Sequence, residues 1–259
     1  MLFLLQSQNG HFSADIETVR ECIDFQREFN RREDMSYISV SCASEAVYAA
    51  GVSRDQDDLS VPVGTLEFVN EYLHKVYSHE PVRAINIPTE LRRPEWLKRE
   101  VRDNVLFYSD MPFKELHSGK LYVKPALYAK QFELDVITPK TWQMFDEKNG
   151  HLPCFISTEL KDIISEWRIF VFRRRIVGVK PYIMDGPIWA APDAKVVQSM
   201  VDAYKSAPPA YTLDVAVTKN METVVIEVHN LISCGLYGFE HSSLPFMLSA
   251  AFQHERSRK

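Results

Sequence analysis

The segment from Ser165 to Glu240 constrains the fold most, because it contains four strand-like runs that each carry a charged residue. The runs are rich in β-branched and aromatic residues and are bounded by turn residues, a pattern typical of β-strands. Arg173, Arg174 and Arg175 separate the first two runs and indicate a turn between paired strands. The four runs cover residues 166–172, 176–180, 212–217 and 224–228.

The charged positions in these runs are Arg168, Lys180, Asp214 and Glu227. A lone carboxylate such as Glu227 in an apolar run is costly to bury unless it is paired or binds a metal ion. Arg168 has a structural alternative, as an ion-pair partner of Glu166 or Asp214. Cations on one pair of strands and carboxylates on the next suit a site that holds a phosphate chain with its metal ions.

Length and charge limit the possible functions. A chain of 259 residues can bury a full core and is expected to form about one to two domains. The net charge of -5 argues against a protein that coats nucleic acid. One basic cluster leaves a local groove open as the minority reading, since such clusters are usually solvated surface. Its members are Arg92, Arg93, Lys98, Arg99 and Arg102.

The cysteines and the apolar runs indicate a soluble cytoplasmic protein. The four cysteines lie far apart, without the spacing of a metal site or a disulfide framework, so reduced thiols are expected. No run approaches the ~20 apolar residues of a membrane span, so no membrane partner is expected. Residues 1–5 are too few for a signal-peptide core and predict a first strand instead.

Residues 1–112 are predicted to form an N-terminal α/β domain. Ser13 or Asp15 is a suitable N-cap for its first helix, and Thr65 caps a later helix from Leu66 to Tyr77. The Gly64-Thr65 pair could bind an anion through free backbone N–H groups. A plain capping turn is the commoner meaning of such a pair, and we prefer it.

Residues 113–259 are predicted to form the second domain, whose first part, residues 113–158, is a small subdomain that carries two lysines. A hairpin of two strands, Leu121 to Pro125 and Phe132 to Ile137, would place Lys124 on its first strand and Lys130 in its loop.

The remainder, residues 159–259, is expected to form a larger subdomain that binds metal. It contains the four charged runs and a predicted helix over residues 192–206, whose apolar positions follow helical periodicity. The end of the chain, from Ser249 onward, is polar and basic, and we expect it to fray.

The order of charged residues between positions 115 and 240 resembles the ATP-grasp superfamily, whose two α+β subdomains hold ATP between them. The likeness is greatest to a clade of small bacterial and phage ATP-grasp proteins. Each motif alone is weak, but eight positions in order make the resemblance specific. The motifs are Lys124-Pro125, Lys130 six residues later, Glu166-Trp167-Arg168, and Glu227 with Asn230 before Gly235-Leu236-Tyr237-Gly238.

This resemblance implies an ATP-grasp fold of mixed α/β (α+β) class behind an N-terminal α/β pre-ATP-grasp domain. It also implies a nucleotide site between the subdomains. Lys124 and Lys130 would neutralise the α- and β-phosphates, and Glu166 would bind the ribose hydroxyls. Adenine would lie against the backbone of three residues, Phe155, Ile156 and Ser157.

The resemblance further implies catalytic and metal-binding residues. Arg168 and Lys180 would be the catalytic cations at the γ-phosphate, or at the acyl phosphate formed from it, although the family more often has arginine at the position of Lys180. Asp214, Glu227 and Asn230 offer hard oxygen ligands for Mg²⁺. ATP and Mg²⁺ are therefore the expected cofactors.

Two features depart from the family pattern. No Gly-rich loop follows the Lys-Pro strand, where many ATP-grasp enzymes cover the phosphates, and Lys130 could substitute for it. The usual Glu-x-Asn is Glu227-Val228-His229 here, with the asparagine one residue late. Either His229 replaces the amide or a bulge brings Asn230 into place. Imidazole is a poorer Mg²⁺ ligand than an amide oxygen, so Mn²⁺ is an alternative metal.

The function implied by the resemblance is that of an ADP-forming ligase in the cytosol of a bacterium or a phage-infected cell. Mg²⁺-ATP would phosphorylate a carboxylate, and an amine would attack the acyl phosphate to give an amide, ADP and phosphate. Small molecules or peptides are the expected substrates, by family analogy. The alternatives are a catalytically degenerate nucleotide-binding module and a nucleic-acid-modifying protein, and the net acidity counts against the latter.

Overall fold

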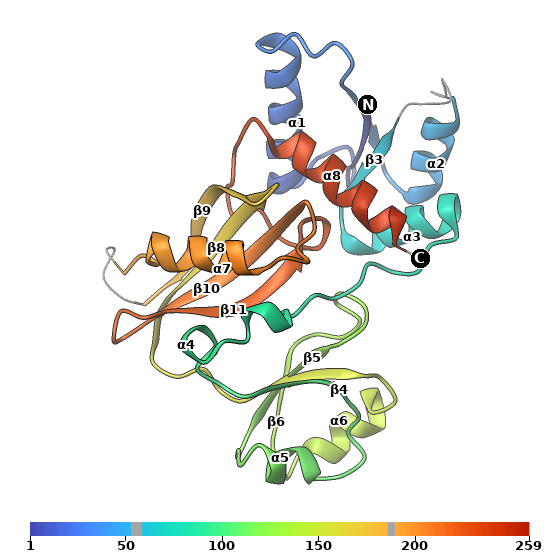
Figure 1. Cartoon of the computed structure of the whole chain (residues 1–259). Coiled ribbons are helices and arrows are strands. Elements are labelled where there is room, and N and C mark those ends of the chain that lie inside the picture. Colours follow the sequence, from blue (N-terminus) through green and yellow to red (C-terminus); the bar gives the residue numbers. More distant parts are fainter. Residues whose placement is uncertain (53–58, 186–189, 259) are drawn as a thin grey trace.

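The computed structural model describes residues 1–52, 59–185 and 190–258, and this part of the chain contains three β-sheets. Figure 1 shows them one above another. We call the three-stranded sheet at the top the first sheet, the sheet of β8 to β11 the central sheet, and the sheet of β4 to β7 the small sheet. The charged runs lie in the central sheet, between the other two.

The first sheet is parallel, in the order β2-β1-β3. Parallel neighbours need crossover connections, which α1 and α2 provide. The Thr65 side chain accepts a hydrogen bond from the amide of Phe68, so the Gly64-Thr65 pair is a capping turn. The elements are β1 Leu2–Gln6, α1 Ala14–Glu28, β2 Ser36–Val40, α2 Ala43–Val52, β3 Ser60–Val63 and α3 Leu66–Tyr77.

Helix α8 (Leu244–Ser257) returns to pack against the core of the first sheet. Figure 1 shows it in red beside α1 and β3. Phe252 and Glu255 are fully buried in this contact, and the Glu255 carboxylate accepts a hydrogen bond from the amide of Arg83. The prediction that the chain frays from Ser249 onward is therefore wrong, because the apolar side of α8 completes a core that local sequence does not reveal.

The small sheet is antiparallel, in the order β4-β7-β5-β6, and α5 and α6 pack against it. The hairpin expected around Lys124 is present as β5 and β6, although β6 is shorter than predicted. Strand β4 belongs to this sheet but precedes residue 112, so the sheet begins before the domain boundary that we expected. The elements are β4 Val101–Val105, α5 Met111–Glu115, β5 Leu121–Pro125, β6 Asp135–Ile137, α6 Trp142–Asn149 and β7 Cys154–Ser157.

The central sheet is antiparallel, in the order β11-β10-β8-β9, and its four strands are the four charged runs. Its apolar face packs against α7 and against the short helices η1 and α4. Arg173 and Arg174 join β8 to β9 with φ of 48° and 66°, as a two-residue hairpin turn requires. The elements are η1 Thr89–Leu91, α4 Pro94–Leu97, β8 Ile163–Phe172, β9 Arg175–Met184, α7 Ala194–Ala203, β10 Ala210–Thr218, β11 Thr223–Asn230 and η2 Leu231–Ser233.

The cysteines and the helices agree with two expectations about the whole chain. All four cysteines are free thiols, and Cys22 and Cys154 are buried. None of the helices within the described ranges combines the length and the apolar character that crossing a membrane requires.

Candidate functional site

A row of four charged residues crosses one face of the central sheet, with one residue from each strand. Asp214 lies opposite Glu227 on one side and Arg168 on the other, and Arg168 lies opposite Lys180. Because residues directly opposite each other in a sheet share a face, all four side chains project from the same side. The row, which we call the charged row, therefore has two carboxylates followed by two cations.

Arg168 and Asp214 form a buried, two-pronged ion pair at the centre of this row. Nε and Nη2 of Arg168 donate to the two carboxylate oxygens of Asp214 at 2.8 and 2.6 Å. Nη1 donates to the carbonyl of Gly235 at 2.9 Å, and the guanidinium lies 4.9 Å from the ring centroid of Tyr237. Burial opposes the charge of Arg168, but its hydrogen bonds to Asp214 hold its pKa above the usual value. Both alternatives for Arg168 thus remain compatible, because guanidinium has five donors and these contacts use three.

Asp214, Glu227 and His229 form a group that could hold a metal ion. Nε2 of His229 lies 3.5 Å from Asp214 and 3.2 Å from Glu227, and one ligand atom from each residue falls within 4.8 Å of the others. Burial disfavours the charge on Glu227, yet hydrogen bonding to His229 and the charges of His229 and Lys124 lower its pKa well below the usual value. Two carboxylates with one imidazole suit a divalent cation, and the imidazole suits Mn²⁺ better than Mg²⁺.

Asn230 does not belong to this group. Its side-chain nitrogen donates to the buried carboxylate of Glu255 at 3.0 Å, and its side-chain oxygen accepts a hydrogen bond from the amide of Ile232 at 3.3 Å. Successive residues of a strand project to opposite faces, so His229 and Asn230 cannot both face Asp214. The expected role of Asn230 as a metal ligand is therefore corrected: His229 takes the position, and Asn230 anchors α8.

Lys124 reaches this group from the small sheet. Its ammonium forms an ion pair with Oε2 of Glu227, with side-chain exposures of 23% and 17% for the two residues. Lys130 lies in the loop after β5, is exposed, and lines a small cavity that also touches Lys124 and Glu227. Both lysines of the resemblance therefore lie at the carboxylate end of the row.

The residues expected to hold adenine and ribose lie on β7 and β8. Phe155 and Ser157 pair with Lys124 and Tyr122 of β5 and share their face, whereas Ile156 points into the apolar core of the small sheet. Only the backbone of Ile156 is thus free to contact a ligand. Burial raises the pKa of Glu166, and the nearby charges of Asp214 and Glu227 add to this effect.

Arg99 is a positioning residue that the sequence did not reveal. Its Nη1 and Nη2 donate to the carbonyls of Val225 and Ile226 at 3.1 and 2.6 Å. The pairing of β10 with β11 shifts at this point, so that Asp214 opposes Glu227 while Val215 opposes Val225, and Ile226 is the extra residue. Burial lowers the pKa of Arg99 to about 10. Arg99 therefore holds the bulge that precedes Glu227.

The rest of the basic cluster is engaged on the protein surface. Arg92 pairs with Asp103, Lys98 with Glu222 and Arg102 with Glu115, while Arg93 lies over the ring of Trp96. Arg99 lies in the same stretch of sequence, and nothing in its local pattern distinguishes it from these solvated neighbours. Only the fold separates the buried arginine from the surface ones.

Three comparisons place this geometry among known proteins. A family model described as an ATP-grasp domain, family 2 of its clade, matches residues 96–244. A search of curated proteins found no match. Among solved structures, the chain is similar to D-alanine–D-alanine ligase from Bacillus anthracis, with a TM-score of 0.57 and 12% identity over 98% of this chain and 95% of that one.

Two further solved structures share the fold. One is a RimK domain ATP-grasp protein from Sphaerobacter thermophilus DSM 20745, with a TM-score of 0.53, 12% identity and 99% coverage of both chains. The other is the ATP-grasp ligase PsnB complexed with minimal precursor, with a TM-score of 0.52 and 11% identity over 92% of this chain and 93% of that one. Because the family model spans more than half of the 259 residues, the chain belongs to this family of ATP-grasp domains.

Proposed function

We propose that the protein is an ATP-dependent carboxylate–amine ligase that works through an acyl phosphate and releases ADP and phosphate. The observation that carries this proposal is the charged row of the central sheet, with Lys124 facing its carboxylate end from the small sheet. Phosphoryl transfer depends mainly on positioning and on charge stabilisation, and this row supplies cations and metal ligands side by side.

The charged row divides the work between its two ends. Asp214, Glu227 and His229 would hold the metal ion, which neutralises charge on the phosphates when it is bound. Lys124 would exchange Glu227 for the α- or β-phosphate, with Lys130 beside it. Arg168 and Lys180 would face the group that is transferred. In the described part of the chain, Lys180 has no carboxylate within ion-pair distance, so its charge is available for an anion.

The similar structures support the choice of chemistry. The Bacillus anthracis D-alanine–D-alanine ligase has also been solved with ATP, and that structure has a TM-score of 0.56 and 14% identity to this chain. PsnB was solved with a peptide precursor. We accordingly propose ATP with Mg²⁺ or Mn²⁺ as cofactors and a small molecule or peptide as substrate, with the cytoplasm as the place of action.

A nucleotide-binding module without turnover is the second candidate. The imidazole of His229, in the position where the family has an amide oxygen, favours it by making the metal site a weaker one for Mg²⁺. A nucleic-acid-modifying role loses support, because three of the five cations in the basic cluster are paired with carboxylates.

Calorimetric titration of ATP with Mg²⁺ or Mn²⁺ tests the proposal, with Lys124→Ala and Glu227→Gln as variants. Lys98→Ala is the matched control, since it also removes a lysine that pairs with a glutamate. We expect binding that is lost in Lys124→Ala, weakened in Glu227→Gln and unchanged in the control. ADP release that requires an added carboxylate and amine would then distinguish a ligase from a binding module. Absence of nucleotide binding with either metal would reject both.

A further inference from the structure

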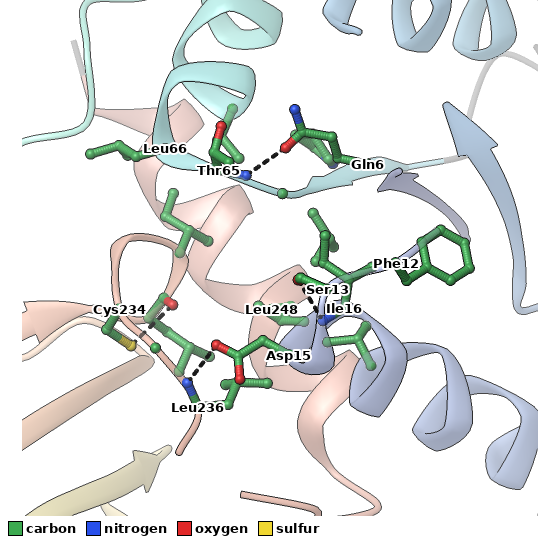
Figure 2. A pocket seen from close by; sticks show the side chains of 18 of the residues that line it. Gln6, Phe12, Ser13, Asp15, Ile16, Thr65, Leu66, Cys234, Leu236 and Leu248 are labelled. Atoms are coloured by element: carbon green, nitrogen blue, oxygen red, sulfur yellow. Dashed lines mark hydrogen bonds between the residues drawn. The ribbon is translucent and has the colours of Figure 1, made fainter. Parts of the chain in front are cut away.

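A cavity of about 450 Å³ lies between the first sheet and the segment that follows β11. It opens at the carboxyl ends of β1 and β3, next to the first turns of α1 and α3, and Figure 2 shows it from close by. Lys130 borders both this cavity and the small one around Lys124 and Glu227. The cavity therefore adjoins the charged row without including it.

One peptide unit joins this cavity to Arg168 of the charged row. The carbonyl of Gly235 accepts a hydrogen bond from Nη1 of Arg168, and the amide of Leu236, in the same peptide unit, donates to Oδ2 of Asp15 (Figure 2). These hydrogen bonds measure 2.9 and 3.0 Å, so Asp15 Oδ2 and Arg168 Nη1 lie within about 8 Å of each other. A ligand on Asp15 would thus lie close to the group that Arg168 stabilises.

The cavity has one acidic side chain and a largely apolar wall. Asp15 is half-buried, and among the described residues only Leu236 donates a hydrogen bond to its carboxylate, at Oδ2. The carboxylate therefore retains acceptor capacity on Oδ1. Gln6 Oε1 is occupied by the amide of Thr65. The apolar part of the wall consists of Ile16, Val19, Leu66, Val69, Leu236 and Leu248.

We propose that this cavity binds the amine substrate, and that this substrate is a compact primary amine with an apolar side chain. Its ammonium group would bind Asp15, because a carboxylate in a half-buried site favours a cationic partner. Its side chain would fill the apolar part of the cavity. This inference rests on the proposed ligase function, to which it adds the chemical class of one substrate.

The reaction that follows is balanced. The amine nitrogen forms a bond to the acyl carbon, and the bond between that carbon and the phosphate oxygen breaks. The departing phosphate takes the electron pair and one of the two protons that the ammonium loses, and water takes the other. Asp15 is not consumed, and its part is to orient the nitrogen toward the acyl phosphate.

Titration of the full chain with L-leucinamide at neutral pH tests the proposal, with 4-methylpentanamide as the analogue that lacks the ammonium group. Asp15→Asn removes the charge but keeps an oxygen that can accept the Leu236 amide. Glu21→Gln, an exposed position on the same helix, is the matched control. Amide NMR spectra monitor both the fold and the site of binding.

We expect saturable binding of leucinamide, with shifts at Leu236 and Val69, and a loss of about tenfold or more in Asp15→Asn but not in Glu21→Gln. Equal binding of the two compounds, or equal affinity in Asp15→Asn and the wild type, would overturn the proposal. So would no binding to the folded protein. The titration with ATP and metal decides the ligase function separately, because Asp15 does not contact the charged row directly.

Discussion

Lys124 of the small sheet and Glu227 of the central sheet form an ion pair although 103 residues separate them in the chain. Glu227 also lies 3.2 Å from His229, so its carboxylate is already neutralised from two sides. A metal ion that binds Glu227 must therefore compete with the ammonium of Lys124. ATP would resolve this competition, because its phosphates offer the lysine another partner.

Removal of Lys124 should consequently have opposite effects on metal and on nucleotide. We expect Lys124→Met to bind Mn²⁺ about three- to tenfold more tightly than the wild type in the absence of ATP, because one repelling charge is gone. The same variant should bind ATP more weakly. Electron paramagnetic resonance of free Mn²⁺ measures the first effect, with Lys98→Met as the control. An unchanged Mn²⁺ affinity would mean that Lys124 does not compete at this site.

Replacement of His229 should change which metal is preferred. We expect His229→Asn to raise the affinity for Mg²⁺ relative to Mn²⁺, because an amide oxygen replaces a nitrogen ligand. Calorimetry with each metal gives the ratio of the two affinities. If His229→Asn and His229→Ala show the same ratio, the side chain at this position is not a ligand.

The Arg168–Asp214 pair should matter for stability as well as for chemistry. Arg168→Met would leave Asp214, whose side chain is 2% exposed, without its partner, and we expect a loss of about 3–5 kcal/mol in the free energy of unfolding. Lys180→Met should cost less than about 0.5 kcal/mol because Lys180 is partly exposed. Urea denaturation compares the two. Equal losses would contradict the central role of the buried pair.

Arg99 should act on metal binding through the backbone of β11. We expect Arg99→Met to weaken Mn²⁺ binding by about tenfold, because the bulge before Glu227 loses two hydrogen bonds. Arg99→Lys should restore little, since an ammonium cannot match the fork of the guanidinium. Metal titration is the measurement, and amide NMR should show changes confined to β11 and its neighbours. Wild-type affinity in Arg99→Met would exclude the positioning role.

Glu166 should make stability depend on pH in a defined direction. Its pKa is raised above the ordinary value of 4.5, mainly by burial, so the folded state disfavours the charged form. The wild type should therefore lose stability relative to Glu166→Gln as pH rises from about 4.5 through the folded-state pKa, and the difference should stay constant above it. Denaturation at several pH values measures this difference. A gap that narrows as pH rises would contradict the raised pKa.

The strands of the central sheet were predictable because each has a strong local pattern, and their charged residues indicated where a candidate site would lie. The register between strands was not predictable. Only the extra residue at Ile226 and the alternation of β11 decide that His229, and not Asn230, faces Asp214. The role of Arg99 was hidden for a related reason, since its partners are carbonyls 126 and 127 residues away. Helix α8 was missed because its buried side depends on the first sheet.

The return of α8 to the first sheet has a consequence for how the chain folds during synthesis. The amide of Arg83 bonds to a carboxylate 172 residues later, so the core around β1 stays open until α8 has left the ribosome. Contacts of such long sequence separation slow folding, and the uncovered apolar surface of the first sheet is a natural client for a chaperone in the meantime. A tag or truncation that removes α8 should therefore harm the yield of soluble protein before it harms the charged row.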